Sequence, residues 1–126
     1  MTHTDDMRAV RDHFLGAVTR GDIEVVRAMY APGAIIWHNN DGVSQAADEN
    51  LRVLGWIAAN VKDFRYEDVR FQATDSGFVE QHVTCGTSPG GRPFAIPTCL
   101  VVTVADGKIA RLDEYLDSAQ TAAIVA

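Results

Sequence analysis

The sequence predicts an α+β fold, a cone in which three helices cover one side of a strongly bent antiparallel sheet and enclose a pocket. Two observations predict it. Before Phe64, apolar residues recur at the spacing of helices, interrupted by one short β-branched stretch. From Phe64 onward, they follow the spacing of strands separated by turns that contain Gly or Pro. Helices that pack on one face of such a sheet leave a pocket between the two layers, open at one end.

The helices are predicted from apolar stripes and from signals at their ends. Gly21 stops the first helix, and Pro32 with Gly33 ends the second, whose buried face includes Tyr30. Asp22 and Ser44 are residue types that cap helix N-termini. We therefore expect helices over residues 4–20, after Asp22, and from Ser44 to about Val61.

The strands are predicted from β-branched and aromatic residues with alternating burial. A short strand covers 34–39, between the second and third helices. On the first long strand, Val69, Phe71 and Ala73 are expected on one face. The long antiparallel strands are expected at 64–74, at 78–87, at 94–104 and after the turn at Asp106-Gly107.

Length and composition limit the possible classes of protein. The 126 residues, 47% apolar and 22% charged, fit one domain over 1–126. A net charge of −6 without any basic run argues against a nucleic-acid partner. The acidic N-terminus and the lack of a long apolar segment argue against a signal peptide or membrane span, so we expect a cytoplasmic protein. Cys85 and Cys99 are interpreted as small hydrophobic residues, and no cluster implies a metal or cofactor.

The closing strand carries the strongest functional signal. Alternation places Leu112, Glu114 and Leu116 on one face, so a single carboxylate lies among apolar side chains. An ionised carboxylate is costly to bury without partners. Glu114 must therefore be paired, be protonated with a raised pKa, or face a cavity. The alternative to a functional role is a structural ion pair with an arginine, such as Arg52, Arg70 or Arg92.

Further candidates lie on other strands. Trp37 and Asn39 share one face of the first strand, and His38 is assigned to the opposite, outer face. His82 is a candidate acid, base or charge partner, although alternation within its own strand favours an outward side chain. Thr98 is a polar residue on an otherwise apolar strand face.

The order of elements and three motifs resemble the nuclear-transport-factor-like superfamily, and within it the SnoaL-like polyketide cyclases, limonene epoxide hydrolases and ketosteroid isomerases. The motifs are Trp37-His38-Asn39 with Asp41-Gly42, then Ile96-Pro97, and above all DGKIARLDEYLD at 106–117. The resemblance covers nearly the whole chain. It implies the cystatin-like, SnoaL-like cone, but this scaffold hosts many activities, so the reaction stays open.

The resemblance to limonene epoxide hydrolase implies roles for five positions. Its acidic residue before the last-strand Tyr corresponds to Glu114. Its water-binding Tyr and Asn, two residues apart on the first strand, correspond to Trp37 and Asn39. Its Arg and second Asp on the middle strand fall at His82 and Thr84, so this catalytic set is incomplete here. The comparison also places His82 inward, against its own alternation, and we adopt that placement because a bulge would reconcile the two.

These observations favour an acid–base enzyme of isomerase, cyclase or hydrolase type, acting on a small hydrophobic molecule that contains a carbonyl or epoxide. Glu114 is the general acid/base, with His82 and Asn39 as partners. The residues expected to contact substrate line an apolar pocket: Trp37, Leu54, Thr84, Ile96, Thr98, Leu112 and Leu116. The alternative is a non-catalytic ligand-binding or structural dimeric module.

The second face of the sheet is expected to meet another copy of the chain. Val101 and Tyr115 lie on that face. We therefore expect a homodimer. Separately, the sequence implies no cofactor.

Overall fold

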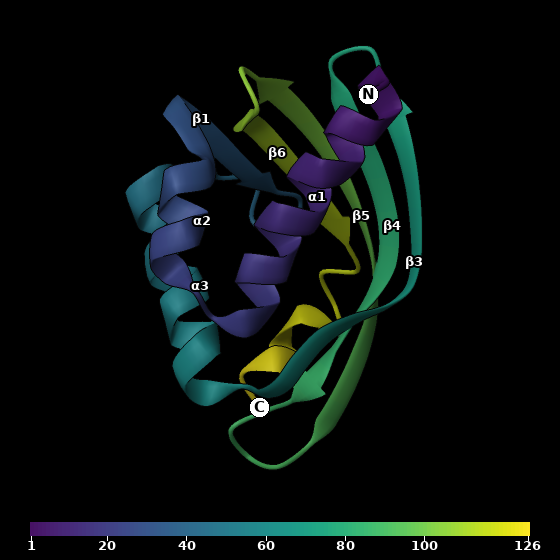
Figure 1. The fold of residues 1–126 in the computed structure, drawn as a ribbon. Coiled ribbons are helices and arrows are strands. Elements are labelled where there is room, and N and C mark those ends of the chain that lie inside the picture. Colours follow the sequence, from purple (N-terminus) through teal and green to yellow (C-terminus); the bar gives the residue numbers. More distant parts are fainter.

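The computed structural model describes residues 1–126, and its helices pack on one face of a six-stranded sheet. Figure 1 shows the long strands curving around the helical layer. This arrangement confirms the predicted α+β fold. The elements are α1 (His3–Arg20), α2 (Ile23–Met29), β1 (Tyr30–His38), β2 (Ser44–Ala46), α3 (Ala47–Asn60), β3 (Lys62–Thr74), β4 (Gly77–Thr87), β5 (Pro93–Ala105), β6 (Lys108–Leu116) and a 3₁₀ turn, η1 (Thr121–Ile124).

The first helix has the end signals of a stable amphipathic helix. The Thr2 hydroxyl accepts a hydrogen bond from the Asp5 amide, and the Asp5 carboxylate accepts one from the Thr2 amide. Gly21 ends α1 with a φ of 71°, which glycine adopts without a Cβ penalty. Asp22 caps α2 as predicted, by accepting a hydrogen bond from the Val25 amide.

Two boundaries differ from the prediction. Ser44 does not cap α3, because Ser44–Ala46 pairs as a short strand with β1. The carboxylate of Glu49 accepts a hydrogen bond from the Ala46 amide and so satisfies a donor at the start of α3. Tyr30 follows α2 and begins β1, where its ring packs against Phe14 of α1 at 5.5 Å between centroids.

The strand order is β2-β1-β6-β5-β4-β3. All neighbouring strands are antiparallel except β1 and β6, which are parallel, so the sheet is mixed rather than purely antiparallel. The predicted hairpin between β5 and β6 is present. Its two loop residues, Asp106 and Gly107, have φ values of 52° and 75°, as a type I′ turn requires.

A bulge in β3 corrects one predicted face. The pairing of β3 with β4 shifts between Glu67 and Arg70, and Asp68 in this interval has a φ of 53°. An extra residue in a strand reverses the alternation that follows it. Phe71 therefore packs on the core while Val69, expected beside it, is 42% exposed.

The buried side chains form two clusters. The main cluster, which includes Phe14, Phe78 and Leu100, lies between the helices and the sheet. The smaller one contains Val61, Phe94 and Ile96, with residues of η1 packed against it. Both cysteines are free, with Cys85 buried and Cys99 half-buried.

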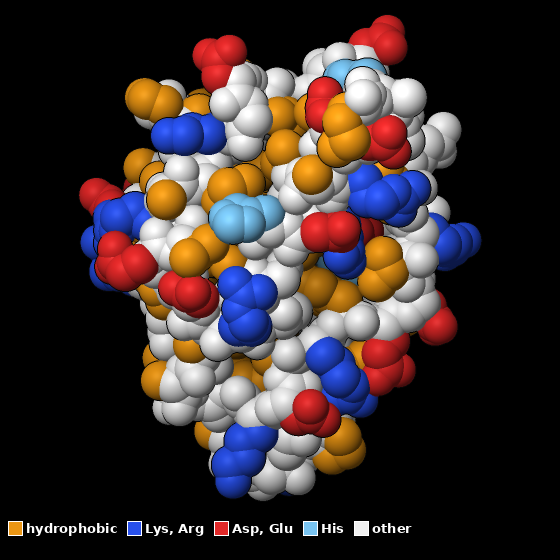
Figure 2. Space-filling view, viewed as in Figure 1, with side chains coloured by type: hydrophobic (Ala, Val, Ile, Leu, Met, Phe, Trp, Pro, Cys, Tyr) orange, Lys and Arg blue, Asp and Glu red, His pale blue; other side chains and the backbone are white.

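The surface charges are mixed on the face that carries the helices. In Figure 2, acidic and basic side chains are interspersed on this face and do not gather into one basic patch. The helices are each too short or too polar to cross a membrane.

Candidate functional site

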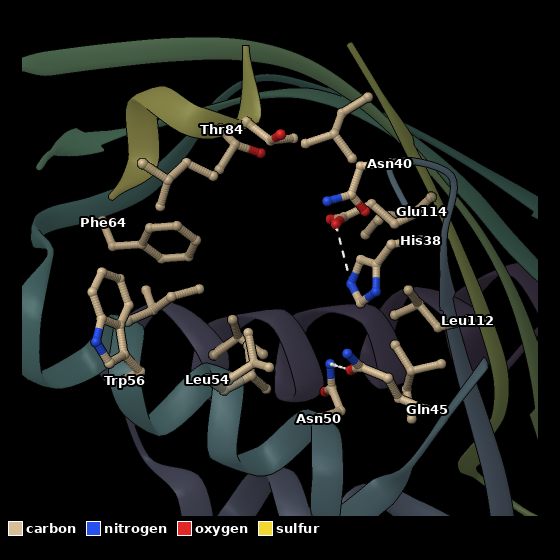
Figure 3. Close-up of a pocket in the computed structure, with 18 of the residues that line it drawn as sticks. His38, Asn40, Gln45, Asn50, Leu54, Trp56, Phe64, Thr84, Leu112 and Glu114 are labelled. Carbon is tan, nitrogen blue, oxygen red and sulfur yellow. Dashed lines mark hydrogen bonds and ion pairs between the residues drawn. The ribbon is translucent and has the colours of Figure 1, made fainter. Parts of the chain in front are cut away.

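A cavity of about 330 Å³ lies between the helical layer and the inner face of the sheet. Of its 24 lining residues, 16 are hydrophobic, so the few polar groups stand out as candidates for chemistry. Figure 3 shows His38, Asn40 and Glu114 together on one side, and Phe64 with Trp56 on the opposite side. The cavity therefore has a polar end and an aromatic end.

Glu114 is a carboxylate at the polar end, where the lining also includes Asp41 of the loop after β1. Its inward neighbours on β6, Leu112 and Leu116, also line the cavity. The β1–β6 register places His38 beside Glu114, and Nε2 of His38 lies 3.3 Å from Oε1 of Glu114. Glu114 therefore pairs with an imidazole and not with the arginines considered in the sequence.

The surroundings of Glu114 favour its neutral form. Its side chain keeps 24% of its surface accessible, but this surface faces a cavity within the protein. Burial raises the pKa of Glu114, and the charges of His38 and then His82 partly offset that rise. The carboxyl group is thus a stronger base, when ionised, than an ordinary surface glutamate.

The structure corrects the predicted face of β1. Trp37 lies outside the cavity, with its ring edge to face with Tyr115 at 5.3 Å between centroids. Asn39 is exposed, and its Oδ1 accepts a hydrogen bond of 2.9 Å from the Leu116 amide. Neither Asn39, predicted as catalytic, nor Trp37, predicted to bind substrate, therefore lines the cavity. The cavity-lining pair two residues apart is His38 and Asn40.

His82 points inward but does not line the cavity. Its side chain is fully buried, and Nδ1 lies 2.6 Å from Oε2 of Glu80. Arg11 binds the same carboxylate through Nε and, at 3.1 Å, through Nη2. Burial alone would raise the pKa of Glu80, but the hydrogen bonds from His82 and Arg11 outweigh it and lower that pKa. The structure thus places His82, predicted as catalytic, in an Arg11–Glu80–His82 chain behind the cavity wall, in which the Glu80 and His82 side chains are fully buried.

The predicted substrate-binding residues divide into two groups. Leu54, Thr84, Leu112 and Leu116 line the cavity. Ile96 and Thr98 do not. Ile96 belongs to the smaller core cluster, and the Thr98 hydroxyl donates to the Ile96 carbonyl oxygen at 3.0 Å. Both therefore lie outside the cavity lining in which they were predicted.

A chain of hydrogen bonds on the helical side of the cavity was not predicted from the sequence. The Tyr30 hydroxyl donates to Oδ1 of Asn50 at 2.5 Å, and Nδ2 of Asn50 donates to Oε1 of Gln45 at 3.4 Å. Figure 3 shows the Asn50–Gln45 contact at the floor of the cavity. Helical spacing offered a signal for Asn50, because it precedes Leu54 by four residues and so shares its face of α3.

Metal binding finds no support in the arrangement of side chains. No group of three or more His, Cys, Asp or Glu residues is placed to hold a metal ion.

Comparison with protein families gives a match over most of the chain. A model of the SnoaL-like domain matches residues 10–112, which include β1, α3, the long strands and the start of β6. No curated protein sequence matches the chain significantly.

Solved structures share the whole fold at low identity. A protein from Xanthomonas campestris pv. campestris, named as a candidate polyketide cyclase, has a TM-score of 0.81 and 18% identity, with 94% of this chain and 98% of that chain covered. An LEH-like epoxide hydrolase of M. tuberculosis has a TM-score of 0.79 and 19% identity, covering 94% and 88%. An NTF2-like protein of unknown function from Burkholderia pseudomallei has a TM-score of 0.82 and 18% identity, covering both chains completely. These likenesses establish the fold.

Proposed function

The chain belongs to the SnoaL-like domain family, and from this premise we propose that it is an enzyme in which Glu114 transfers protons to and from a small hydrophobic substrate. The observation that carries the proposal is the Glu114–His38 contact of 3.3 Å at the polar end of a mainly hydrophobic cavity. A base is most effective when its pKa lies near the working pH, and burial moves Glu114 in that direction.

The step that fits this geometry best is removal of a proton from a carbon next to a carbonyl. The Glu114 carboxylate takes the proton, the electrons of the C–H bond form a C=C bond to the carbonyl carbon, and the π electrons of the C=O bond move onto oxygen to give an enolate. In a ketone with a C=C bond between its β and γ carbons, return of the proton from Glu114 to the γ carbon completes an isomerisation. In a substrate with a second carbonyl, the enolate carbon attacks that carbonyl carbon, and the proton returns to the new alkoxide oxygen to complete a cyclisation. His38, bound to Oε1, orients the carboxylate and favours its ionised form.

The substrate class follows from the walls of the cavity. Phe64 and Trp56 form the aromatic end, Leu54 lies between it and the polar end, and Leu112 lies at the polar end beside His38. A flat alicyclic or aromatic ketone would bury its ring among these side chains and place its reactive carbon near Glu114. The structural neighbours include proteins named for cyclase and epoxide hydrolase activity, so an epoxide is the second candidate substrate.

The proposal is tested by deuterium exchange into 2-tetralone, a bicyclic ketone with an acidic C–H beside its carbonyl. Exchange in D₂O is followed by proton NMR with the native protein, with Glu114→Gln and with Asp113→Asn as the matched control. Asp113 is adjacent in β6 and hydrogen bonds to Arg111 away from the cavity. We expect exchange to fall by about 100-fold or more in Glu114→Gln and to stay native in Asp113→Asn, because acid–base catalysis contributes factors of this size.

Other outcomes would separate the competing functions. Equal exchange by the native protein and Glu114→Gln would contradict the proposal. Opening of cyclohexene oxide to its diol, dependent on Glu114, would replace the carbonyl substrate by an epoxide. Saturable binding of 2-tetralone without exchange or epoxide opening would support the alternative function, a ligand-binding module.

A further inference from the structure

Tyr66 of β3 is a polar residue in the cavity wall that the proposed proton transfer by Glu114 does not use. It lines the cavity and pairs across the sheet with Thr84, which lines it too. Its ring is stacked on the ring of His82, with 4.0 Å between centroids and 21° between planes. Phe64 meets it edge to face at 5.6 Å. Tyr66 is thus held between two rings, one of which is buried.

The stack beneath Tyr66 is anchored by charge. His82 cannot turn without breaking its 2.6 Å contact with Glu80, and Glu80 is fixed in turn by Arg11 of α1. The side chains of His82 and Glu80 are fully buried. Water therefore cannot replace their hydrogen bonds, and a buried charged group without a partner is costly. The Arg11–Glu80–His82 chain therefore holds the ring of Tyr66 in one orientation, which is what a binding group needs.

Elimination identifies the hydroxyl that is free to bind a ligand. Four residues with hydroxyl groups line the cavity. The Tyr30 hydroxyl donates to Asn50, and the Thr121 hydroxyl donates to the Ser118 carbonyl. Thr98 gives its proton to the Ile96 carbonyl, so the 2.8 Å contact between Thr84 and Thr98 uses the Thr84 proton. The remaining hydroxyl, on Tyr66, takes part in none of these side-chain hydrogen bonds.

The charges around Tyr66 keep its hydroxyl protonated. Burial raises its pKa, and the negative charges of Glu114 and Glu80 raise it further. The hydroxyl is therefore a neutral donor in the wall of the same cavity as Glu114, which acts as proton acceptor. A molecule that satisfies both must offer an acceptor to Tyr66 and a proton to Glu114.

We propose that the Tyr66 hydroxyl binds the carbonyl oxygen of the substrate and stabilises the enolate oxygen formed when Glu114 removes the neighbouring proton. This inference rests on the proposed function and specifies its substrate class as a ketone, or another carbonyl compound with an adjacent C–H. During the step the Tyr66 proton stays on its oxygen, and its hydrogen bond strengthens as negative charge develops on the substrate oxygen.

The test uses 2-tetralone labelled with ¹³C at the carbonyl and infrared difference spectroscopy of the bound ketone. A hydrogen bond to the oxygen lowers the frequency of the carbonyl stretch. Tyr66→Phe removes only the hydroxyl, and Tyr115→Phe is the matched control, because Tyr115 is exposed and lies outside the cavity. We expect the lowered frequency in the native protein and in Tyr115→Phe, and a frequency near that in an apolar solvent in Tyr66→Phe.

Exchange kinetics give the second readout. We expect kcat for deuterium exchange to fall by about 100-fold in Tyr66→Phe, as removal of one oxyanion donor does in other enzymes. Glu114→Gln should lose exchange and keep the lowered frequency. An equal frequency in the native protein and Tyr66→Phe, or no saturable binding of the ketone, would overturn the assignment of Tyr66. Unchanged exchange in Glu114→Gln with the frequency shift lost in Tyr66→Phe would instead refute the proposed function and leave Tyr66 as a ligand-binding residue.

Discussion

Nε2 of His38 lies 3.3 Å from Oε1 of Glu114, and this contact joins the first strand of the chain to the last. His38 ends β1, the first strand, and Glu114 is on β6, the last. Parallel pairing of β1 with β6 brings them into register. The family match covers β1 and most of the sheet but stops at Leu112, so the pairing and not the match places His38 beside Glu114.

Replacing His38 with Gln should move the pH dependence of exchange to higher pH. The charge of His38 partly offsets the rise in the Glu114 pKa caused by burial, so its removal leaves that pKa higher. Less of the carboxylate is then ionised at a pH below the new midpoint, and exchange there should fall about 10-fold for each pH unit that the midpoint moves. The pH–rate profile with 2-tetralone measures the midpoint, with His13→Gln on the exposed side of α1 as control. An unmoved midpoint would show that His38 does not influence Glu114.

Glu114 should also make the native protein less stable as the pH rises. Its pKa is higher in the folded than in the unfolded chain, so the native state binds more protons between the two values. Stability therefore falls as the pH rises from the unfolded pKa to the folded one, by at most about 1.4 kcal/mol per pH unit, and stays low above it.

Glu114→Gln removes this ionisation, so its stability advantage over the native protein should grow across the same window. Urea unfolding from pH 4 to 8 measures the difference, with Asp113→Asn as control. A difference between Glu114→Gln and the native protein that does not change with pH would contradict the raised pKa.

The contribution of Glu80 to stability should depend on pH in the opposite direction to that of Glu114. Its lowered pKa means that its contribution to stability is present above the unfolded value and is lost as the pH falls through the folded one. Glu80→Gln removes one partner from a buried ion pair and should cost about 3 kcal/mol at pH 7, with a smaller cost at low pH. Unfolding of Glu67→Gln gives the control, because the Glu67–Arg65 pair is exposed. If Glu80→Gln lowers the free energy of unfolding less than Glu67→Gln does, the Arg11–Glu80–His82 chain is not stabilising.

The fold could be predicted from the sequence because its signals are local. Gly21 and Asp22 mark helix ends, and the Asp106-Gly107 turn determines the β5–β6 hairpin without reference to distant residues. The parallel β1–β6 pair could not be predicted in this way, because nothing near β1 specifies which strand it joins.

The site was predicted less completely because alternation is ambiguous where both faces are apolar. Ile35, Ile36 and Trp37 are consecutive, so either His38 or Asn39 could have pointed inward, and only burial of Ile36 decides it. On β4 the more apolar set, with Val79 and Val83, lies on the outer face. The inner set includes Glu80, whose charge is compensated by Arg11, 69 residues away. An ion pair between residues so far apart in the chain leaves no signal in the sequence near either residue.

The outer face of the sheet should be covered by a second copy of the chain, and we propose that Val101→Lys dissociates this homodimer. Val101 and Tyr115 are 39% and 45% exposed there, and Trp37 packs on Tyr115. Exposed apolar groups on a sheet face are typical of interfaces, and a lysine at position 101 would bring a charged, strongly hydrated group into this one. Sedimentation velocity at micromolar concentration measures the state, with Val43→Lys as control because Val43 is 49% exposed in the turn before β2. A native protein that sediments as a monomer would contradict the dimer, and equal dissociation by both lysines would contradict this face as its interface.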